Sequence, residues 1–158
     1  VFLIPNGDAA ETVPFDGKLN PVNSAGYSIT ISGNGQERIL SITDLENLPL
    51  HKATFNTKWD LKRDFVGVKL SDLLSHVGIT KFKRLYVLAS NDYKITIEHN
   101  DPGIENVILA SRINGEPLAL DNKGPFFMIW PDQAEDLIAG KTVAAKWIWG
   151  TVEIRKIR

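Results

Sequence analysis

The chain has 158 residues, of which 43% are hydrophobic and 23% charged, and its formal net charge is -1. This length and composition are those of one globular domain with a core of its own. The near-zero charge argues against a nucleic-acid-binding role, because no excess of basic residues is available to neutralise phosphates. No stretch approaches the ~20 apolar residues that a transmembrane helix needs.

The sequence contains no cysteine, which excludes thiol nucleophiles, disulfides and thiolate metal ligands. The compartment is left open, because a cysteine-free chain suits the cytosol and the periplasm equally. The first residue is Val1 rather than methionine. We therefore expect a processed or trimmed N-terminus, for which a removed signal peptide is one explanation.

Residues 1–26 predict an N-terminal arm, whose first part is interrupted by proline, glycine and aspartate, and residues 27–158 the domain itself. Apolar and polar side chains alternate over residues 27–32, which predicts a half-buried strand. A tight turn at Gly33-Asn34-Gly35 is expected to return residues 38–42 as the second arm of a hairpin.

Two short helices are predicted next. Thr43 and Glu46 have the spacing of a capping box, and the first helix ends before Pro49. A strand over residues 52–59 and a charged loop over residues 60–64 follow. The second helix has Ser71 as its N-cap and Gly78 after its C-terminus, and one apolar face made of Leu70, Leu73, Leu74 and Val77.

The rest of the chain predicts strands joined by turns. Residues 84–89 and 93–98 form a hairpin around Asn91-Asp92, and residues 107–113 and 116–120 a hairpin around Asn114-Gly115. Two more strands are expected: Phe126 to Trp130, which is stopped by Pro131, and a C-terminal one within residues 151–157. The sum predicts a mixed, mainly antiparallel, β-rich α+β domain.

The segment from Gly124 to Trp149 is rich in aromatic residues, among them Trp130 and Trp147. Large rings beside Asp132 and other polar groups suit a pocket for a flat heteroaromatic ligand. They equally suit a packed core, because aromatic side chains bury the most apolar area. The pattern alone favours the core.

Motifs for catalysis are missing from the sequence, which has no GxGxxG, P-loop, HExxH or nucleophile elbow. His51, His76 and His99 are scattered, and no carboxylate pair stands out for acid/base chemistry. We therefore predict a binding module with no catalytic residues and no metal site.

Several motifs occur in the order and spacing of a known family. They are Phe65-x-Gly67-Val68-x-Leu70-x-Asp72-Leu73-Leu74-x-x-x-Gly78, Ala89-x-Asn91-Asp92-Tyr93, Leu109-Ala110, Asn114-Gly115-x-Pro117-Leu118, Gly124-Pro125 to Pro131, and Lys146-Trp147. From about Ile39 to Ile157 the chain resembles the oxidoreductase molybdopterin-binding domain of the sulfite oxidase type. The resemblance implies a mixed α+β domain with a compact β-rich core.

Two departures from that family bear on function. Its enzymes hold molybdenum through a cysteine thiolate, and here Thr54, Asn56 and Thr57 occupy that neighbourhood. Phe126 and Phe127 replace an arginine that usually follows the Gly-Pro pair, which removes a cation suited to phosphate. We therefore expect neither molybdenum nor sulfite-oxidase-type catalysis, but a neutral, flat ligand without a phosphate tail.

Small cysteine-free members of this kind resemble periplasmic pterin-binding proteins. Their relatives sense a reduced pterin and regulate a membrane-bound diguanylate cyclase/phosphodiesterase. The resemblance implies the same here: a non-catalytic, periplasmic pterin sensor with a membrane-bound regulatory partner. Two other functions stay open, a molybdopterin-dependent oxidoreductase with a non-thiolate metal ligand and an adaptor domain that has lost its ligand.

Because the resemblance implies a pterin ligand, we now favour ligand stacking over core packing for at least one of Trp130, Trp147 and Trp149. A carboxylate or amide would read the pyrimidine edge, because a carboxylate accepts the paired N–H donors of a 2-aminopyrimidinone. The predicted ligand-binding residues are Trp130, Trp147, Trp149, Asp132, Asn91, Asp92, Tyr93, Arg112, Lys146 and Trp59.

Each polar or rim position also has a structural interpretation. Asn91 and Asp92 suit plain turn chemistry, and Lys146 suits a solvated surface lysine. Arg112, which could hold a ring carbonyl together with Lys146, equally suits a surface cross-strand ion pair. Trp59, a possible rim residue, suits the core.

Overall fold

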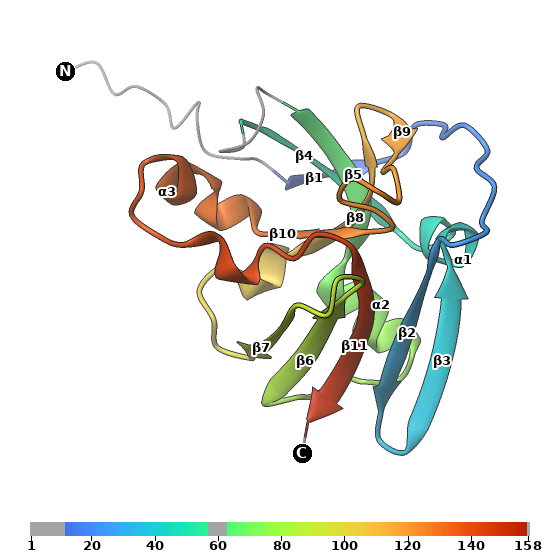
Figure 1. Cartoon of the computed structure of the whole chain (residues 1–158), viewed down its shortest axis with the longest axis vertical. Coiled ribbons are helices and arrows are strands. Elements are labelled where there is room, and N and C mark those ends of the chain that lie inside the picture. The colour runs from blue at the N-terminus through green and yellow to red at the C-terminus, as the bar shows by residue number, and fades with distance from the viewer. Residues whose placement is uncertain (1–11, 57–62, 158) are drawn as a thin grey trace.

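The structure, a computed structural model, describes residues 12–56 and 63–157 (Figure 1). Trp59 and Thr57 lie outside the described residues. One sheet has the order β1 (Thr12–Phe15), β4 (Leu50–Phe55), β5 (Arg63–Lys69), β8 (Ile108–Ile113) and β10 (Phe127–Ile129), with β9 (Glu116–Pro117) also paired to β8. All of these pairings are antiparallel.

The second sheet has the order β3 (Gln36–Ser41), β2 (Ser28–Gly33), β11 (Thr151–Ile157), β6 (Arg84–Ala89) and β7 (Lys94–Glu98). Its β2–β11 pairing is parallel and the others are antiparallel. The helices are short: α1 (Ile42–Glu46), α2 (Leu70–His76) and α3 (Ala134–Ile138), with 3-10 turns η1 (Ile104–Asn106), η2 (Pro131–Gln133) and η3 (Ala144–Lys146). The expected mainly antiparallel, β-rich α+β fold is confirmed.

One buried apolar cluster joins the two sheets. The period-two pattern of β2 contributes to this cluster. Ile29 and Ile31 are each 1% exposed, whereas the side chain between them is more exposed. The segment between β10 and β11 links the sheets, since Met128 N donates to Ile148 O (3.0 Å) and Thr151 N to Phe126 O (2.8 Å). This link positions the aromatic residues discussed below.

The three predicted hairpins are present, with positive φ at Asn34, Asp92 and Asn114 in their turns. β9 is shorter than the predicted strand over residues 116–120, because Ala119 O accepts hydrogen bonds from Asn122 N and Gly124 N and turns the chain. Part of the predicted loose arm is also in the sheet, since β1 pairs with β4 at its edge.

The predicted cap of α1 is wrong by two residues. Ser41 is the N-cap: its Oγ accepts from Asp44 N (3.1 Å), and its own N donates to Asp44 Oδ2 (2.9 Å). Starting the helix at Ile42 places Ile42 and Leu45 one turn apart, and both are buried. Core burial therefore decides between two local capping options, and it frees the Glu46 side chain for another contact.

The predicted cap of α2 is also wrong, because the helix begins at Leu70 and has no side-chain cap. Leu70 N instead donates to Val107 O (2.9 Å), so the backbone ahead of β8 satisfies this terminal donor. Gly78 follows the helix with φ +83°, as predicted. In the part of the chain that the structure describes, no helix is long and apolar enough to cross a membrane.

Candidate functional site

Five aromatic side chains from distant parts of the chain pack together at one end of the first sheet. Phe55 of β4 stacks on Phe65 of β5 with 4.9 Å between ring centroids, and Trp147 meets Phe55 edge-on at 5.8 Å. Phe127 of β10 contacts Phe65, Trp147 and Trp149 at 6.0, 6.2 and 5.9 Å. These spacings are those of favourable aromatic pairs, so the cluster is a rigid platform.

The three tryptophans of this region differ in exposure. Trp130 is 0% exposed and Trp147 4%, whereas Trp149 is 38% exposed. Trp130 Nε1–H also donates to Lys146 O (2.6 Å). The structure therefore corrects the prediction that Trp130 or Trp147 offers a ring face to a ligand: both are core side chains here, and Trp149 is the indole that reaches solvent.

Two turns meet the backbone next to Trp149. Lys123 Nζ lies 5.2 Å from the Trp149 ring centroid, in cation–π geometry. Gly150 N donates to Lys123 O (2.8 Å), and Gly150 O accepts from Ser90 N (2.8 Å). These bonds hold the β6–β7 turn and the loop before β10 beside the Gly150 backbone, which follows Trp149, and we define the Trp149 surface as Asn91, Asp92, Tyr93, Lys123 and Trp149.

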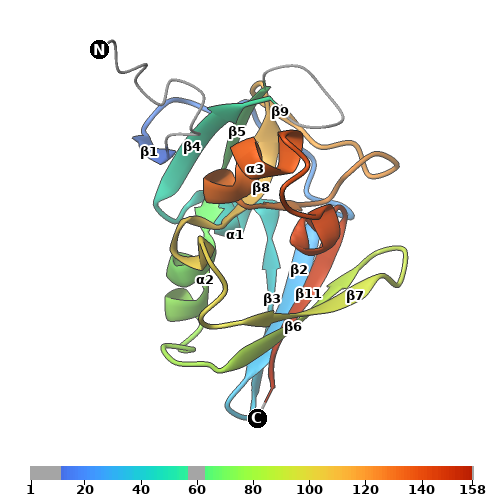
Figure 2. The same ribbon diagram turned by 90° about the vertical axis from the view of Figure 1, so that its left-hand side faces the viewer.

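The β6–β7 turn contributes three predicted residues to this surface. Asn91 Oδ1 accepts from Tyr93 N (3.1 Å), and Asp92 has φ +68°, so both residues do perform turn chemistry. Tyr93 Oη donates to Ala145 O (2.7 Å), which ties β7 to η3 beside it (Figure 2). Their predicted role toward a ligand is compatible with this geometry, since Asn91 and Asp92 are exposed.

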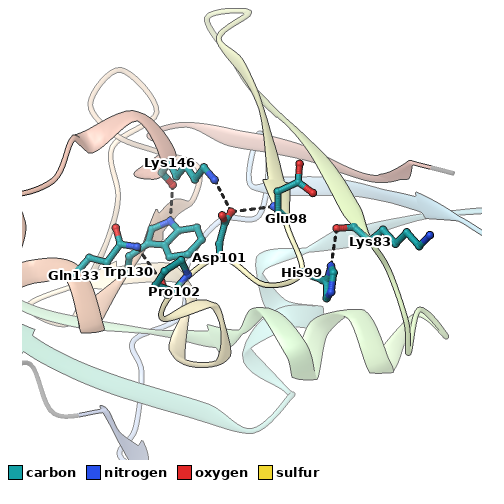
Figure 3. Close-up of polar contacts among 8 residues, drawn as sticks. All are labelled: Lys83, Glu98, His99, Asp101, Pro102, Trp130, Gln133 and Lys146. Atoms are coloured by element: carbon teal, nitrogen blue, oxygen red, sulfur yellow. Dashed lines mark hydrogen bonds and ion pairs between the residues drawn. The ribbon is translucent and has the colours of Figure 1, made fainter.

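Lys146 and Asp132 each contact the segment between β7 and β8, and Figure 3 shows the contacts of Lys146. Lys146 Nζ pairs with Asp101 Oδ2, which also accepts from Glu98 N (2.9 Å), so the interpretation of Lys146 as a solvated surface lysine is wrong. Asp132 accepts from Asn106 Nδ2 at 2.9 and 3.2 Å. Both side chains thus fasten residues 98–106 to the segment that follows β10, which is a structural role that the sequence did not indicate.

Arg112 is away from both groups and is 1% exposed. Its Nε and Nη2 donate to the two carboxylate oxygens of Glu46 at 2.8 Å each, and Ser111 Oγ donates to Glu46 Oε2 at 2.8 Å. The predicted surface ion pair is therefore wrong, because the pair with Glu46 is buried. Arg112 Nη1 is buried and has no hydrogen-bond partner among the described residues, and the predicted contact with a ring carbonyl stays a prediction. Sequence reasoning missed Glu46 as the partner, since nothing local relates residues 46 and 112.

The neighbourhood expected to supply the metal-binding thiolate contains a hydroxyl instead. Thr54 Oγ1 donates to Asp64 Oδ1 (2.7 Å), and Asn56 is exposed. An engaged hydroxyl is a poor substitute for a soft thiolate, so these residues do not fit molybdenum as the enzymes of the resembled family bind it. Within the described residues, 12–56 and 63–157, no group of three or more His, Asp or Glu side chains could hold a metal ion.

The pKa of His51 on β4 is shifted by its surroundings. Its pKa is lowered from 6.5 by burial and then by the nearby Lys69 ammonium, with Asp72 acting in the opposite direction. Its Nδ1 is buried and has no hydrogen-bond partner. The imidazole is therefore neutral in the folded protein under conditions where it is partly charged in the unfolded chain.

This shift predicts how stability depends on pH. The unfolded state binds more protons than the folded state between pH 6.5 and the lower folded pKa, so stability falls as pH falls through that window. Urea midpoints measured between about pH 5 and pH 8 are expected to show a smaller slope for His51→Gln than for the parent. His76→Gln, at the exposed end of α2, is the control, and equal slopes for all three proteins would contradict the assignment to His51.

The comparisons with known proteins agree with this architecture. The family model for the oxidoreductase molybdopterin binding domain matches residues 16–153. The chain belongs to this family. The match covers both sheets apart from β1 and the last four residues of β11, so the family is that of nearly the whole described domain.

A solved structure shows the same fold. The crystal structure of the sulfane dehydrogenase SoxCD from Paracoccus pantotrophus matches with a TM-score of 0.62 and 17% sequence identity, over 87% of this chain. The chain spans 40% of that protein's chain, so the likeness is one of fold within a larger protein. No curated protein matches the sequence. The predicted resemblance to the molybdopterin-binding domain of the sulfite oxidase type is confirmed.

Proposed function

We propose that this molybdopterin-binding-type domain binds a pterin ring without molybdenum, as a non-catalytic sensor. The observation that carries the proposal is the Trp149 indole, the exposed edge of an otherwise buried aromatic cluster. A flat heteroaromatic ring can stack on it beside the Lys123 ammonium. Asp92, on the turn that meets the Gly150 backbone, is our candidate acceptor for the paired N–H donors of the pyrimidine edge.

The chemistry of the Thr54 region supports the absence of catalysis. The chain has no cysteine, and the Thr54 hydroxyl is already bonded to Asp64. The redox chemistry that a thiolate-bound molybdenum supplies in enzymes of this type has no matching ligand among the described residues. Elemental analysis of protein purified from its native host tests this directly, because stoichiometric molybdenum would favour the oxidoreductase with an unusual ligand.

The compartment and the partner of this sensor are proposed from the family resemblance alone. The chain would act in the periplasm, and its ligand occupancy would regulate a membrane-bound diguanylate cyclase/phosphodiesterase. Co-purification of such a partner with the chain, at a yield that changes when a reduced pterin is added, is the expected result. An unchanged yield with and without the pterin would contradict the signalling role.

Titration with tetrahydrobiopterin tests the binding site. Trp149→Ala is expected to weaken binding about tenfold to a hundredfold, since stacking of a base on an aromatic side chain contributes about 1–3 kcal/mol. Trp149→Phe should retain most of the affinity. Asp92→Asn keeps a residue that tolerates positive φ but removes the carboxylate charge, and it should also weaken binding.

Val143→Ala, at a side chain that is 73% exposed and outside the Trp149 surface, is the control and should bind as the parent does. Affinity for tetrahydrobiopterin that is unchanged by both Trp149→Ala and Asp92→Asn would contradict this site. Fluorescence titration and calorimetry on the same samples provide the measurement.

A second candidate function is an adaptor domain that binds no small ligand. The observation in its favour is that both indoles are buried: Trp130 donates a hydrogen bond to Lys146 O, and Trp147 packs against the rings of Phe55 and Phe127. The absence of a released pterin from native protein, together with no binding of reduced pterins, would favour the adaptor over the sensor.

A further inference from the structure

A cavity of about 420 Å³ lies between the start of α2, the segment after α2 and the loop that carries η1. Leu70 and Leu74 of α2 form one wall, and Phe82 and Ile104 contribute further apolar surface. The volume is in the range of pockets for small molecules, about 300–1,000 Å³. Its lining includes no residue of the Trp149 surface.

Side-chain contacts hold one wall of this cavity, the loop that carries η1, against the rest of the fold. The loop wall is fastened by Asp101, which accepts from Glu98 N and pairs with Lys146 (Figure 3). Asn106, at the end of η1, donates to Asp132 and accepts from Lys69 Nζ (3.3 Å). A cavity with fixed walls costs little ordering entropy when a ligand enters, so these contacts favour binding.

The mouth of the cavity carries charges of both signs. Lys81, His99 and Glu105 line it, and all three residues are exposed. The His99 backbone is anchored, because its N–H donates to Lys83 O (2.8 Å). A ligand that complements these side chains and the apolar interior carries a carboxylate, an ammonium and an apolar body.

We propose that the cavity binds a free α-amino acid with an apolar side chain. Its carboxylate faces Lys81 and His99, its ammonium faces Glu105, and its side chain enters the apolar interior. The opposite charges favour a free amino acid over a segment of a partner protein, because the interior of a polypeptide carries neither terminal charge. The proposal is independent of pterin binding, since it uses other residues.

NMR titration of the full chain with L-phenylalanine is the test. Backbone shifts are expected at Leu70, Ser71, Leu74 and Ile104, with a Kd on the order of 1 mM or tighter. Phenylpropionate lacks the ammonium and phenethylamine lacks the carboxylate, so each should bind about tenfold more weakly than L-phenylalanine.

Charge reversals at the mouth sharpen the test. Lys81→Glu and Glu105→Lys should each weaken L-phenylalanine binding about tenfold. Lys83→Glu is the matched control, because Lys83 is an exposed lysine close by that does not line the cavity, and it should bind as the parent does. Thr80→Trp, at an exposed lining position, should fill the cavity and abolish binding.

Three results would overturn the proposal. One is the absence of shifts at about 10 mM L-phenylalanine, well above the expected Kd. Another is a set of shifts confined to the Trp149 surface. The third is an equal loss of binding in Lys81→Glu and Lys83→Glu, which would show a general charge effect rather than a contact at the mouth.

Discussion

Replacing Arg112 by alanine is expected to lower the free energy of unfolding by about 3–5 kcal/mol, because it leaves the Glu46 carboxylate without its charged partner in a buried site. The Arg112 and Glu46 side chains are 1% and 12% exposed, so solvent screens their interaction little. The contact is bidentate at 2.8 Å and is supported by Ser111. Urea denaturation followed by tryptophan fluorescence measures the change.

The chain provides a matched control for this prediction. Arg155 and Glu153 also form an ion pair, with a shortest N–O distance of 2.7 Å, but the arginine is 54% exposed. Arg155→Ala should therefore leave the urea midpoint nearly unchanged. The double variant Glu46→Gln/Arg112→Met should be more stable than Arg112→Ala, since it leaves no unpaired charge. Equal losses for Arg112→Ala and Arg155→Ala would contradict the structural role of the buried pair.

Trp130→Ala is expected to cost a similar amount, about 3–5 kcal/mol, because it removes the largest fully buried side chain and leaves a cavity. It also leaves Lys146 O without the hydrogen bond from Trp130 Nε1. Trp130→Phe keeps much of the ring volume and should lose less. The same urea experiment measures both variants.

Trp149→Ala separates the two tryptophan roles. Its indole is 38% exposed, so truncation should cost clearly less stability than Trp130→Ala while weakening pterin binding. Trp130→Ala should show the opposite pattern, with a large loss of stability. A Trp130→Ala variant that is as stable as the parent but binds no pterin would instead assign the stacking role, expected for at least one of Trp130, Trp147 and Trp149, to Trp130.

Local patterns predicted most of the elements. Alternation at Ile29 and Ile31 identified β2, and the turn residues at Asn91-Asp92 and Asn114-Gly115 identified two hairpins. These signals are readable because strand period and turn conformation depend on residues a few positions apart. The family resemblance agreed with this in implying a compact β-rich core, but the order of strands in the two sheets was not predicted.

The candidate site stays a prediction. The structure brings the turn before Tyr93 next to the Gly150 backbone, which follows Trp149, and neither strand period nor turn chemistry indicates this meeting. The assignment of Trp130, Lys146 and Arg112 to the same site was not supported, since hydrogen bonds and ion pairs fix each of them elsewhere. No local signal distinguishes a buried tryptophan from an exposed one nineteen positions along the chain.

The sequence by itself determined most of the strands, the hairpin turns, the absence of a thiolate and the family, but not β1 or the start of β5. Only the tertiary structure decided which side chains are buried and which partners they have. Ser41 rather than Thr43 caps α1 because Ile42 must enter the core, and this choice releases Glu46 to meet Arg112 across 66 residues of chain. Burial and charge pairing depend on distant segments meeting in space, and for that reason they are not written in any local pattern.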